Sequence, residues 1–242
     1  MQITGCLARQ MKGKEMDFLK YKFGNRTVQF AAAKGTIPAP LIVMNAYSAE
    51  ETDSFRQLEQ VVQRPFSCLV VSDLNWDTDM CPFNAPQINK WSGPFKAGAD
   101  AYLEELTGEI IPSVLKKKNT EPSEIIISGY SLAGLFAIYS LYKTDLFSRV
   151  VSCSGSLWMP KAKEFFLQHE LLRTPDAVYL SIGETESATK NQFLSKGQIN
   201  TEAVIECLKG RGIHTKYEIN PGNHTFEVCK RLVKGLAWIL EQ

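Results

Sequence analysis

The 242-residue chain lacks most of the signatures that place a protein in a class at once. It has no C-x-x-C pair, no zinc-ligand spacing, no P-loop and no G-x-G-x-x-G segment, so we expect neither a metal nor a cofactor. No run approaches the roughly 18 apolar residues of a membrane span. Residues 1–17 contain charges but no apolar core long enough for a signal peptide. We therefore expect a cytoplasmic protein with no membrane partner.

Charge of one sign is also scarce. Lys and Arg number 27 and Asp and Glu 26, which leaves a net charge of +1 and gives no reason to expect nucleic acid as a partner. The nearest approach to a basic patch, residues 116–118, is typical of a solvated helix end. Six cysteines are scattered along the chain, and we expect reduced thiols that mostly fill the core.

The chain does contain apolar, β-branched runs that alternate with helix-prone segments. Hydrophobic content of 44% and charged content of 22% are ordinary for a globular protein, and the length suits one domain over residues 1–242. Strands are expected at residues 16–23, 27–32, 41–44, 66–74, 124–129, 149–153, 177–182 and 215–219. Helices are expected at residues 50–63, 95–118, 132–143, 161–172, 199–211 and 226–241.

This alternation predicts an α/β fold with a mostly parallel central sheet and helices on both faces. The first two strands, on either side of Gly24, are typical of a hairpin that adds antiparallel strands at one edge. Pro112 is expected to kink the long helix in which it lies. In sheets of this kind the chemistry lies at the carboxyl ends of the strands.

Residues 124–134 are the most informative segment. An apolar run ends at Ser131, with Gly129 and Ala133 two positions away on either side, and a helix-prone stretch follows. This G-x-S-x-A pattern is a variant of the G-x-S-x-G nucleophile elbow, a strained turn that needs small neighbours and exposes the serine hydroxyl. The amide of Leu132 is then left at a helix N-terminus, where negative charge is stabilised. The other interpretation is an ordinary turn with a capping serine.

Two further strand ends carry groups that could activate this serine. One strand runs into Gly183-Glu184-Thr185-Glu186, where either carboxylate could orient an imidazolium, and the residues alone do not separate them. Another runs into a Pro-Gly-Asn turn that ends in His224, our candidate base. The order Ser, Glu, His is the one that the α/β-hydrolase plan requires. The other two histidines lie in a charged helix and in an exposed turn, and are poorer candidates.

These segments resemble the Putative esterase (esterase D-like) family of α/β-hydrolases, which includes trilactone-siderophore esterases related to enterochelin esterase. Residues 128–136 resemble its nucleophile segment, residues 152–158 its serine-rich stretch ending in Trp, and residues 222–224 its base-bearing turn. Its Gly-x-x-Glu acid site favours Glu186 over Glu184. The resemblance spans most of the chain and implies the α/β-hydrolase fold with Ser131, Glu186 and His224 as catalytic residues.

The chain departs from the family at the second donor of the oxyanion hole. Many members carry His-Gly or Asp-Gly after the strand that supplies this donor, whereas this chain has Asn45-Ala46-Tyr47. Because the hole uses backbone N–H groups, we expect the amide of Ala46 or Tyr47 to act together with that of Leu132.

Substrate binding is assigned to residues near the same strand ends. Trp76, Trp158 and Tyr130 are candidates for lining an acyl or aryl pocket, and Trp91 is a weaker one. Such rings also fill gaps between loops. Asp77 and Asp79 are candidates for binding a cationic group or a metal, although two carboxylates without further ligands are more typical of a helix cap or a solvated loop.

The sequence therefore predicts a serine carboxylic-ester hydrolase that forms an acyl-enzyme with a small-molecule ester, a bulky or siderophore-type lactone ester being one candidate. Two alternatives remain, an acyltransferase on the same scaffold and a non-catalytic binding module. A peptidase is less favoured, because amides demand more assistance to the leaving group. The sequence indicates neither the identity of the ester nor the oligomeric state.

Overall fold

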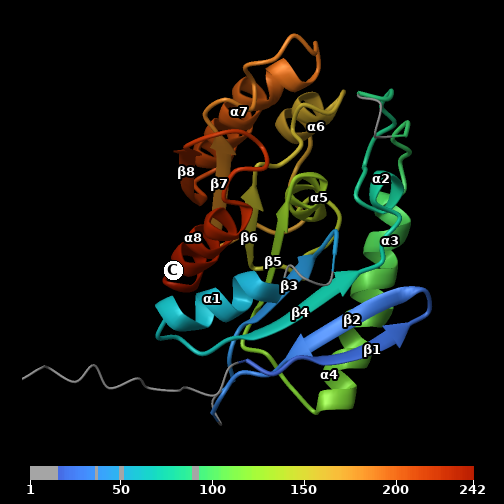
Figure 1. Cartoon of the computed structure of the whole chain (residues 1–242), viewed down its shortest axis with the longest axis vertical. Helices are drawn as coiled ribbons and strands as arrows, with labels where there is room; N and C mark the ends of the chain where they lie inside the picture. Colours follow the sequence, from blue (N-terminus) through green and yellow to red (C-terminus); the bar gives the residue numbers. More distant parts are fainter. Residues whose placement is uncertain (1–15, 36–37, 49–51, 89–92) are drawn as a thin grey trace, which may run out of the picture.

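The computed structural model describes residues 16–35, 38–48, 52–88 and 93–242 (Figure 1). Most of the segment considered for a signal peptide, together with Cys6 and Trp91, lies outside them. The centre is a sheet with the strand order β1-β2-β4-β3-β5-β6-β7-β8. Its strands are β1 (Leu19–Phe23), β2 (Arg26–Ala31), β3 (Leu41–Asn45), β4 (Ser67–Ser72), β5 (Ile125–Tyr130), β6 (Arg149–Cys153), β7 (Ala177–Gly183) and β8 (His214–Asn220).

The predicted hairpin lies at one edge of the sheet. β1 pairs antiparallel with β2 and β2 antiparallel with β4, while the remaining neighbours are parallel. The two-residue loop of the hairpin places Gly24 at φ +54°, a value that glycine adopts without steric cost and that suits the twist of the flanking strands. The structure thus confirms a mostly parallel sheet with an antiparallel hairpin.

Helices cover both faces of the sheet. Alternate strand residues face opposite sides, so Val43 packs with the helices of one face and Met44 with those of the other. On one face lie α1 (Asp53–Val61) and α8 (Val228–Leu240), side by side in Figure 1. On the other lie α3 (Ala99–Glu105), α4 (Ile111–Lys118), α5 (Leu132–Ser140), α6 (Ala162–Gln168) and α7 (Gly197–Gly210).

The helix expected at residues 95–118 differs from the prediction. It begins at Ala99, because residues 93–98 form a loop in which Phe95 pairs with Ala85 in an isolated bridge. Pro112 is accompanied by a π-helical turn, Leu106–Ile110, between α3 and α4. Proline has no N–H for the regular helical bond, and the wider turn accommodates that loss. A short helix that sequence reasoning missed, α2 (Trp76–Asp79), follows β4.

Two smaller expectations, on the basic helix end and on the cysteines, are met in the described part of the chain. Lys116, Lys117 and Lys118 form the last turn of α4, as predicted for a basic helix end. The five described cysteines are free thiols, and three of them are buried. No described helix is long and apolar enough to cross a membrane. The carboxyl ends of β5, β6, β7 and β8 meet at one edge of the sheet, since these strands are parallel.

Candidate active site

Ser131 lies in a strained turn between β5 and α5. Its backbone has φ +59° and ψ −124°, a conformation that side-chain-bearing residues rarely adopt. A Cβ at Gly129 would come within 2.3 Å of the backbone carbon and oxygen of Ala133, so glycine is required there. The Ser131 amide donates to the Cys153 carbonyl at 3.1 Å, and the Ser131 carbonyl accepts from the Ser156 amide at 3.0 Å. The turn is therefore held by both the helix and the loop after β6.

The structure brings the three predicted catalytic candidates into one hydrogen-bonded chain. His224 Nε2 lies 3.0 Å from Ser131 Oγ, and His224 Nδ1 lies 2.7 Å from Glu186 Oε2. The three residues follow β5, β7 and β8, so the sheet sets their separation. Because an ionised carboxylate only accepts hydrogen bonds, Nδ1 carries the proton and Nε2 faces the serine hydroxyl as an acceptor.

Glu186 is held as an oriented anion. Its side chain is 10% exposed. Oε1 accepts hydrogen bonds from the Gly183 amide at 2.6 Å, from Ser154 Oγ at 2.7 Å and from Arg231 Nη1 at 3.0 Å, which leaves Oε2 for His224. Burial by itself raises the pKa of Glu186, but the hydrogen bonds from His224 and Ser154, the charge of His224 and the Gly183 amide outweigh burial and lower that pKa.

The loops that carry the acid and the base are bonded directly to each other. The Glu184 amide donates to the Asn220 carbonyl at 2.8 Å, and the Thr185 amide to the Gly222 carbonyl at 3.2 Å. The Glu184 carboxylate points away from His224, is exposed, and accepts the Gly222 amide at 3.1 Å. The structure thus distinguishes the two glutamates. Glu186 contacts the imidazole of His224, whereas Glu184 accepts a hydrogen bond from the turn that precedes His224.

One of the two expected oxyanion donors besides Leu132 is engaged in the sheet. The Ala46 amide donates to the Val71 carbonyl at 2.9 Å, which extends the pairing of β3 with β4, so the expectation for Ala46 is wrong. Tyr47 follows it, with its ring edge-on to Trp76 at a centroid distance of 5.4 Å. Leu132 is the first residue of α5, where an amide has no partner within its own helix.

A pocket of about 290 Å³ opens beside Ser131 and His224. Its wall includes Trp76 and Trp158, as expected, and Asp77, whose Oδ2 accepts only a long bond of 3.4 Å from the Gly93 amide. Apolar side chains that sequence reasoning did not select complete much of the lining: Ile88, Phe95, Ile182 and Leu194. Phe95 packs edge-on to Trp158 at 5.6 Å, so the pocket is largely aromatic and apolar.

Two residues considered for ligand binding serve other purposes. Tyr130 does not line the pocket, because its hydroxyl is turned behind the site and donates to the His224 carbonyl at 2.7 Å. Burial raises the pKa of Tyr130 to about 12, so the hydroxyl stays a neutral donor. Asp79 is buried, accepts from Arg26 at 2.5 Å and from the Asn75 amide at 2.8 Å, and does not join Asp77 in a common site.

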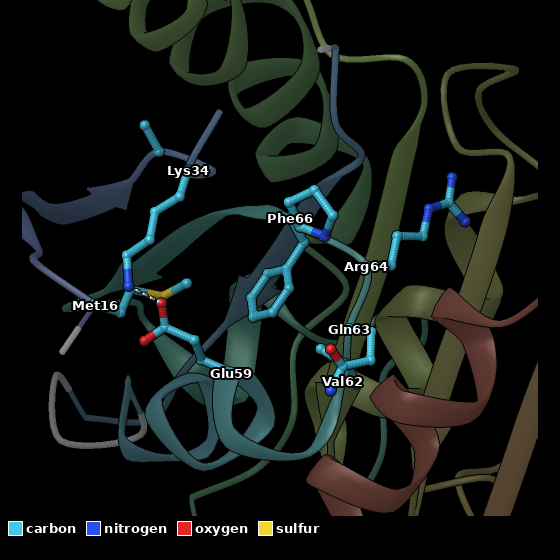
Figure 2. A pocket seen from close by; sticks show the side chains of 9 residues that line it. Met16, Lys34, Glu59, Val62, Gln63, Arg64 and Phe66 are labelled. Carbon is cyan, nitrogen blue, oxygen red and sulfur yellow. Dashed lines mark hydrogen bonds and ion pairs between the residues drawn. The ribbon is translucent and has the colours of Figure 1, made fainter. Parts of the chain in front are cut away.

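A second pocket, of about 340 Å³, lies at the amino end of β4, away from the carboxyl ends of the strands where Ser131 is found (Figure 2). Figure 2 shows Lys34 and Glu59 meeting on one side of it, with Phe66 beside them. The Lys34 ammonium lies 2.6 Å from the Glu59 carboxylate. It contains no histidine and no serine. Of these two pockets, the one at Ser131 joins a cavity to a set of side chains that could carry out acyl transfer.

Sequence reasoning missed Ser154 and Arg231, both of which contact Glu186. Ser154 lies within the serine-rich segment, but nothing in that pattern indicates which hydroxyl reaches the acid. Arg231 is the fourth residue of α8, a helix that the sequence indicated only through its apolar residues.

A strained serine after β5, a histidine after β8 and a largely buried carboxylate between them form an arrangement that is typical of serine hydrolases with the α/β-hydrolase fold. Comparison with known proteins then gives the family. The sequence model of the family described as "Putative esterase" matches residues 25–237. The chain therefore belongs to this family, as its sequence segments indicated.

Individual relatives are more distant. The chain is 27% identical over 146 residues to the uncharacterized protein YbbA of Bacillus subtilis, a match that covers 57% of this chain and 58% of that protein. In structure it is similar to an IroE-like serine hydrolase from Shewanella oneidensis, with a TM-score of 0.74, 16% identity, and 94% and 80% of the two chains covered. The siderophore hydrolase EstA from Aspergillus nidulans has a TM-score of 0.68, 14% identity, and 100% and 99% covered. These likenesses confirm the α/β-hydrolase fold.

Proposed function

We propose that this protein is a serine carboxylic-ester hydrolase that forms an acyl-enzyme at Ser131. The observation that carries the proposal is the continuous chain from Ser131 Oγ through both nitrogens of His224 to Glu186, with separations of 3.0 and 2.7 Å. Family membership over residues 25–237 supports ester hydrolysis as the reaction. Residues 1–242 are proposed to act as one hydrolase domain, and the cytoplasmic location expected from the sequence stays a prediction.

The reaction begins when Ser131 attacks the ester carbonyl and His224 Nε2 takes the hydroxyl proton. Glu186 holds the Nδ1 tautomer and stabilises the imidazolium that forms. The amides of Leu132 and Tyr47 are proposed to receive the oxyanion, and loss of one such donor costs about 3 kcal/mol in other hydrolases. His224 then protonates the leaving alcohol, the acyl-enzyme remains on Ser131, and water activated by the same imidazole releases the acid.

The pocket supports an apolar or aromatic acyl group of limited size. Its volume of about 290 Å³ is at the lower end of the roughly 300–1,000 Å³ typical of small-molecule sites. A large lactone of the siderophore type is one candidate, because EstA from Aspergillus nidulans, which has a similar fold, is a siderophore hydrolase. Such a substrate would place one ester arm in this pocket and leave the rest outside. Asp77 on the wall favours neutral or cationic substrates over anionic ones.

The first test is covalent labelling with a fluorophosphonate probe, followed by mass spectrometry of the modified peptide. The wild type should be labelled on the peptide that contains Ser131, and Ser131→Ala and His224→Ala should not react. Ser113→Ala, which removes an exposed serine from α4, is the matched control and should label like the wild type. A folded wild type that does not label would overturn the proposal and favour a non-catalytic binding module.

Product analysis separates hydrolysis from acyl transfer, because the same residues serve both. Wild-type protein is incubated with a p-nitrophenyl ester in the presence of an alcohol or an amine. We expect the free acid as the product. A predominant transfer product would assign the protein to the acyltransferases instead.

A further inference from the structure

Arg231 lies behind the candidate active site, and its side chain is 3% exposed. Nη1 and Nη2 donate five hydrogen bonds to groups that follow four successive strands. The acceptors are Tyr130 Oη at 3.0 Å, Ser154 Oγ at 3.1 Å, Glu186 Oε1 at 3.0 Å, the Pro221 carbonyl at 2.7 Å and the Asn223 carbonyl at 2.9 Å. One guanidinium thus joins the carboxyl ends of β5, β6, β7 and β8.

This position is unfavourable for a cation on its own. Burial removes the guanidinium from water, and the first turn of α8 places it near the positive end of the helix dipole. The Glu186 carboxylate compensates the charge, and the two carbonyls of the turn before His224 supply well-placed acceptors. The planar fork of arginine meets both needs at once, which a lysine ammonium cannot reproduce.

We propose that Arg231 is a positioning residue, which fixes the Glu186 carboxylate and the turn that carries His224 relative to each other and so holds His224 Nε2 on Ser131. This inference rests on the proposed function. Arg231 touches Oε1 of Glu186 and the backbone on the N-terminal side of His224, and it does not line the pocket. Its loss should therefore lower kcat and leave KM unchanged.

The test compares Arg231→Met, which removes the charge and the donors, with Arg231→Lys, which keeps the charge. Arg149→Met is the matched control. Arg149 also bonds α8 to the sheet, because it donates to the Ile239 carbonyl and pairs with Glu124 at 3.2 Å. It lies at the amino end of β6, away from the carboxyl ends that carry the candidate active site. Both methionine variants remove an arginine that holds α8, so both should lower Tm, and only one lies behind the candidate active site.

We expect kcat of Arg231→Met to fall about 100-fold, the size of effect produced by a displacement of about 1 Å in a reacting group, with KM within about twofold. Arg231→Lys should recover part of this loss. Arg149→Met should keep the wild-type kcat at a temperature where it is folded. Arg231→Met with kcat within about twofold of the wild type would overturn the proposal, and so would an equal loss in Arg149→Met. A rise in KM at constant kcat would instead assign Arg231 to substrate binding.

The pH profile gives a readout that loss of packing alone would not move. The acid limb of kcat/KM reports protonation of the imidazole base. Removing a nearby cation makes that protonation more favourable, so the limb should shift to higher pH in Arg231→Met and stay in place in Arg149→Met. An unshifted limb in Arg231→Met would count against the proposal. The other titratable side chains around the guanidinium are Tyr130, Cys153, Glu218 and His224.

Proton NMR keeps this inference separable from the proposed function. The downfield signal of the His224 Nδ1 proton reports the bond to Glu186 whether or not the protein turns over any ester. It should be lost or displaced in Arg231→Met and retained in Arg149→Met. If Arg231→Met does not fold, the Nδ1 proton signal and kcat are measured in Arg231→Lys instead. Wild-type values for both quantities in Arg231→Lys would overturn the proposal.

Discussion

Replacement of Glu186 by glutamine is the change whose effect the structure defines best. The two carboxylate oxygens have different surroundings, since Oε1 accepts from the Gly183 amide and Arg231 Nη1 while Oε2 faces His224 Nδ1. In Glu186→Gln the amide oxygen must take the Oε1 side. The opposite orientation would set the amide group against two buried donors, at a cost of about 1–3 kcal/mol each.

The amide nitrogen of the glutamine then points at His224. It donates to Nδ1, so Nδ1 becomes an acceptor and the imidazole proton moves to Nε2, where it blocks transfer from Ser131. An imidazole held in this wrong tautomer loses about 10⁴-fold in kcat in chymotrypsin-like proteases. We expect a loss of about 10³- to 10⁴-fold here, because the same three groups are in contact.

The assay is kcat for a p-nitrophenyl ester, together with the rate of fluorophosphonate labelling, in Glu186→Gln and in Glu184→Gln. Glu184 is the matched control because it accepts only the Gly222 amide, and the carbonyl of a glutamine accepts the same bond. Glu184→Gln should stay within about twofold of the wild type. A Glu186→Gln enzyme that keeps more than a tenth of wild-type kcat would refute the tautomer argument. Equal losses in both variants would refute the assignment of the acid.

Three further predictions concern stability. In Gly129→Ala the new methyl group meets Ala133 backbone atoms at 2.3 Å, so Tm and labelling should both fall, and unchanged values would contradict the elbow geometry. Asp79→Asn removes the nearest anion from the half-buried Arg26, which keeps its pair with Glu105, and should cost about 1–3 kcal/mol of unfolding free energy with kcat retained, measured by urea unfolding. The folded-state pKa of Glu186 is lowered, so its contribution to stability is present above its reference pKa of 4.5 and is lost as pH falls through the folded value. The stability difference between the wild type and Glu186→Gln should therefore be larger at pH 7 than at pH 3.

Local pattern was sufficient for most of the fold and for the three residues now in contact. β6 occupies residues 149–153 as predicted, because a short β-branched run between turn signals is typical of a strand. Ser131, Glu186 and His224 could be selected because each follows a strand, and parallel strands bring their carboxyl ends together. The choice of Glu186 over Glu184 needed the family resemblance, since two carboxylates two residues apart look alike until the loop is folded.

What the sequence could not show depends on contacts between distant segments. Burial of Arg231 is set by acceptors that lie up to 101 residues away, so an arginine in a helix is read as a surface residue. The loss of Ala46 as a donor depends on how far the pairing of β3 with β4 continues. Tyr130 was a candidate for the pocket next to Ser131, but successive residues at a strand end point in different directions.

The described segment between β4 and α3 has a consequence for how this scaffold can change. It supplies Trp76, Asp77, Ile88 and Phe95 to the pocket wall and none of the residues in the Ser131–His224–Glu186 chain. It is closed on itself by the bridge between Ala85 and Phe95 and by the bond from the Lys96 amide to the Asp77 carbonyl. Part of the pocket wall is therefore encoded apart from the Ser131–His224–Glu186 chain, while Trp158, Ile182 and Leu194 of the same wall come from other segments. If this segment is replaced by the corresponding one from another member of the family, the preference for the acyl group should change. The contacts between Ser131, His224 and Glu186 should stay as they are.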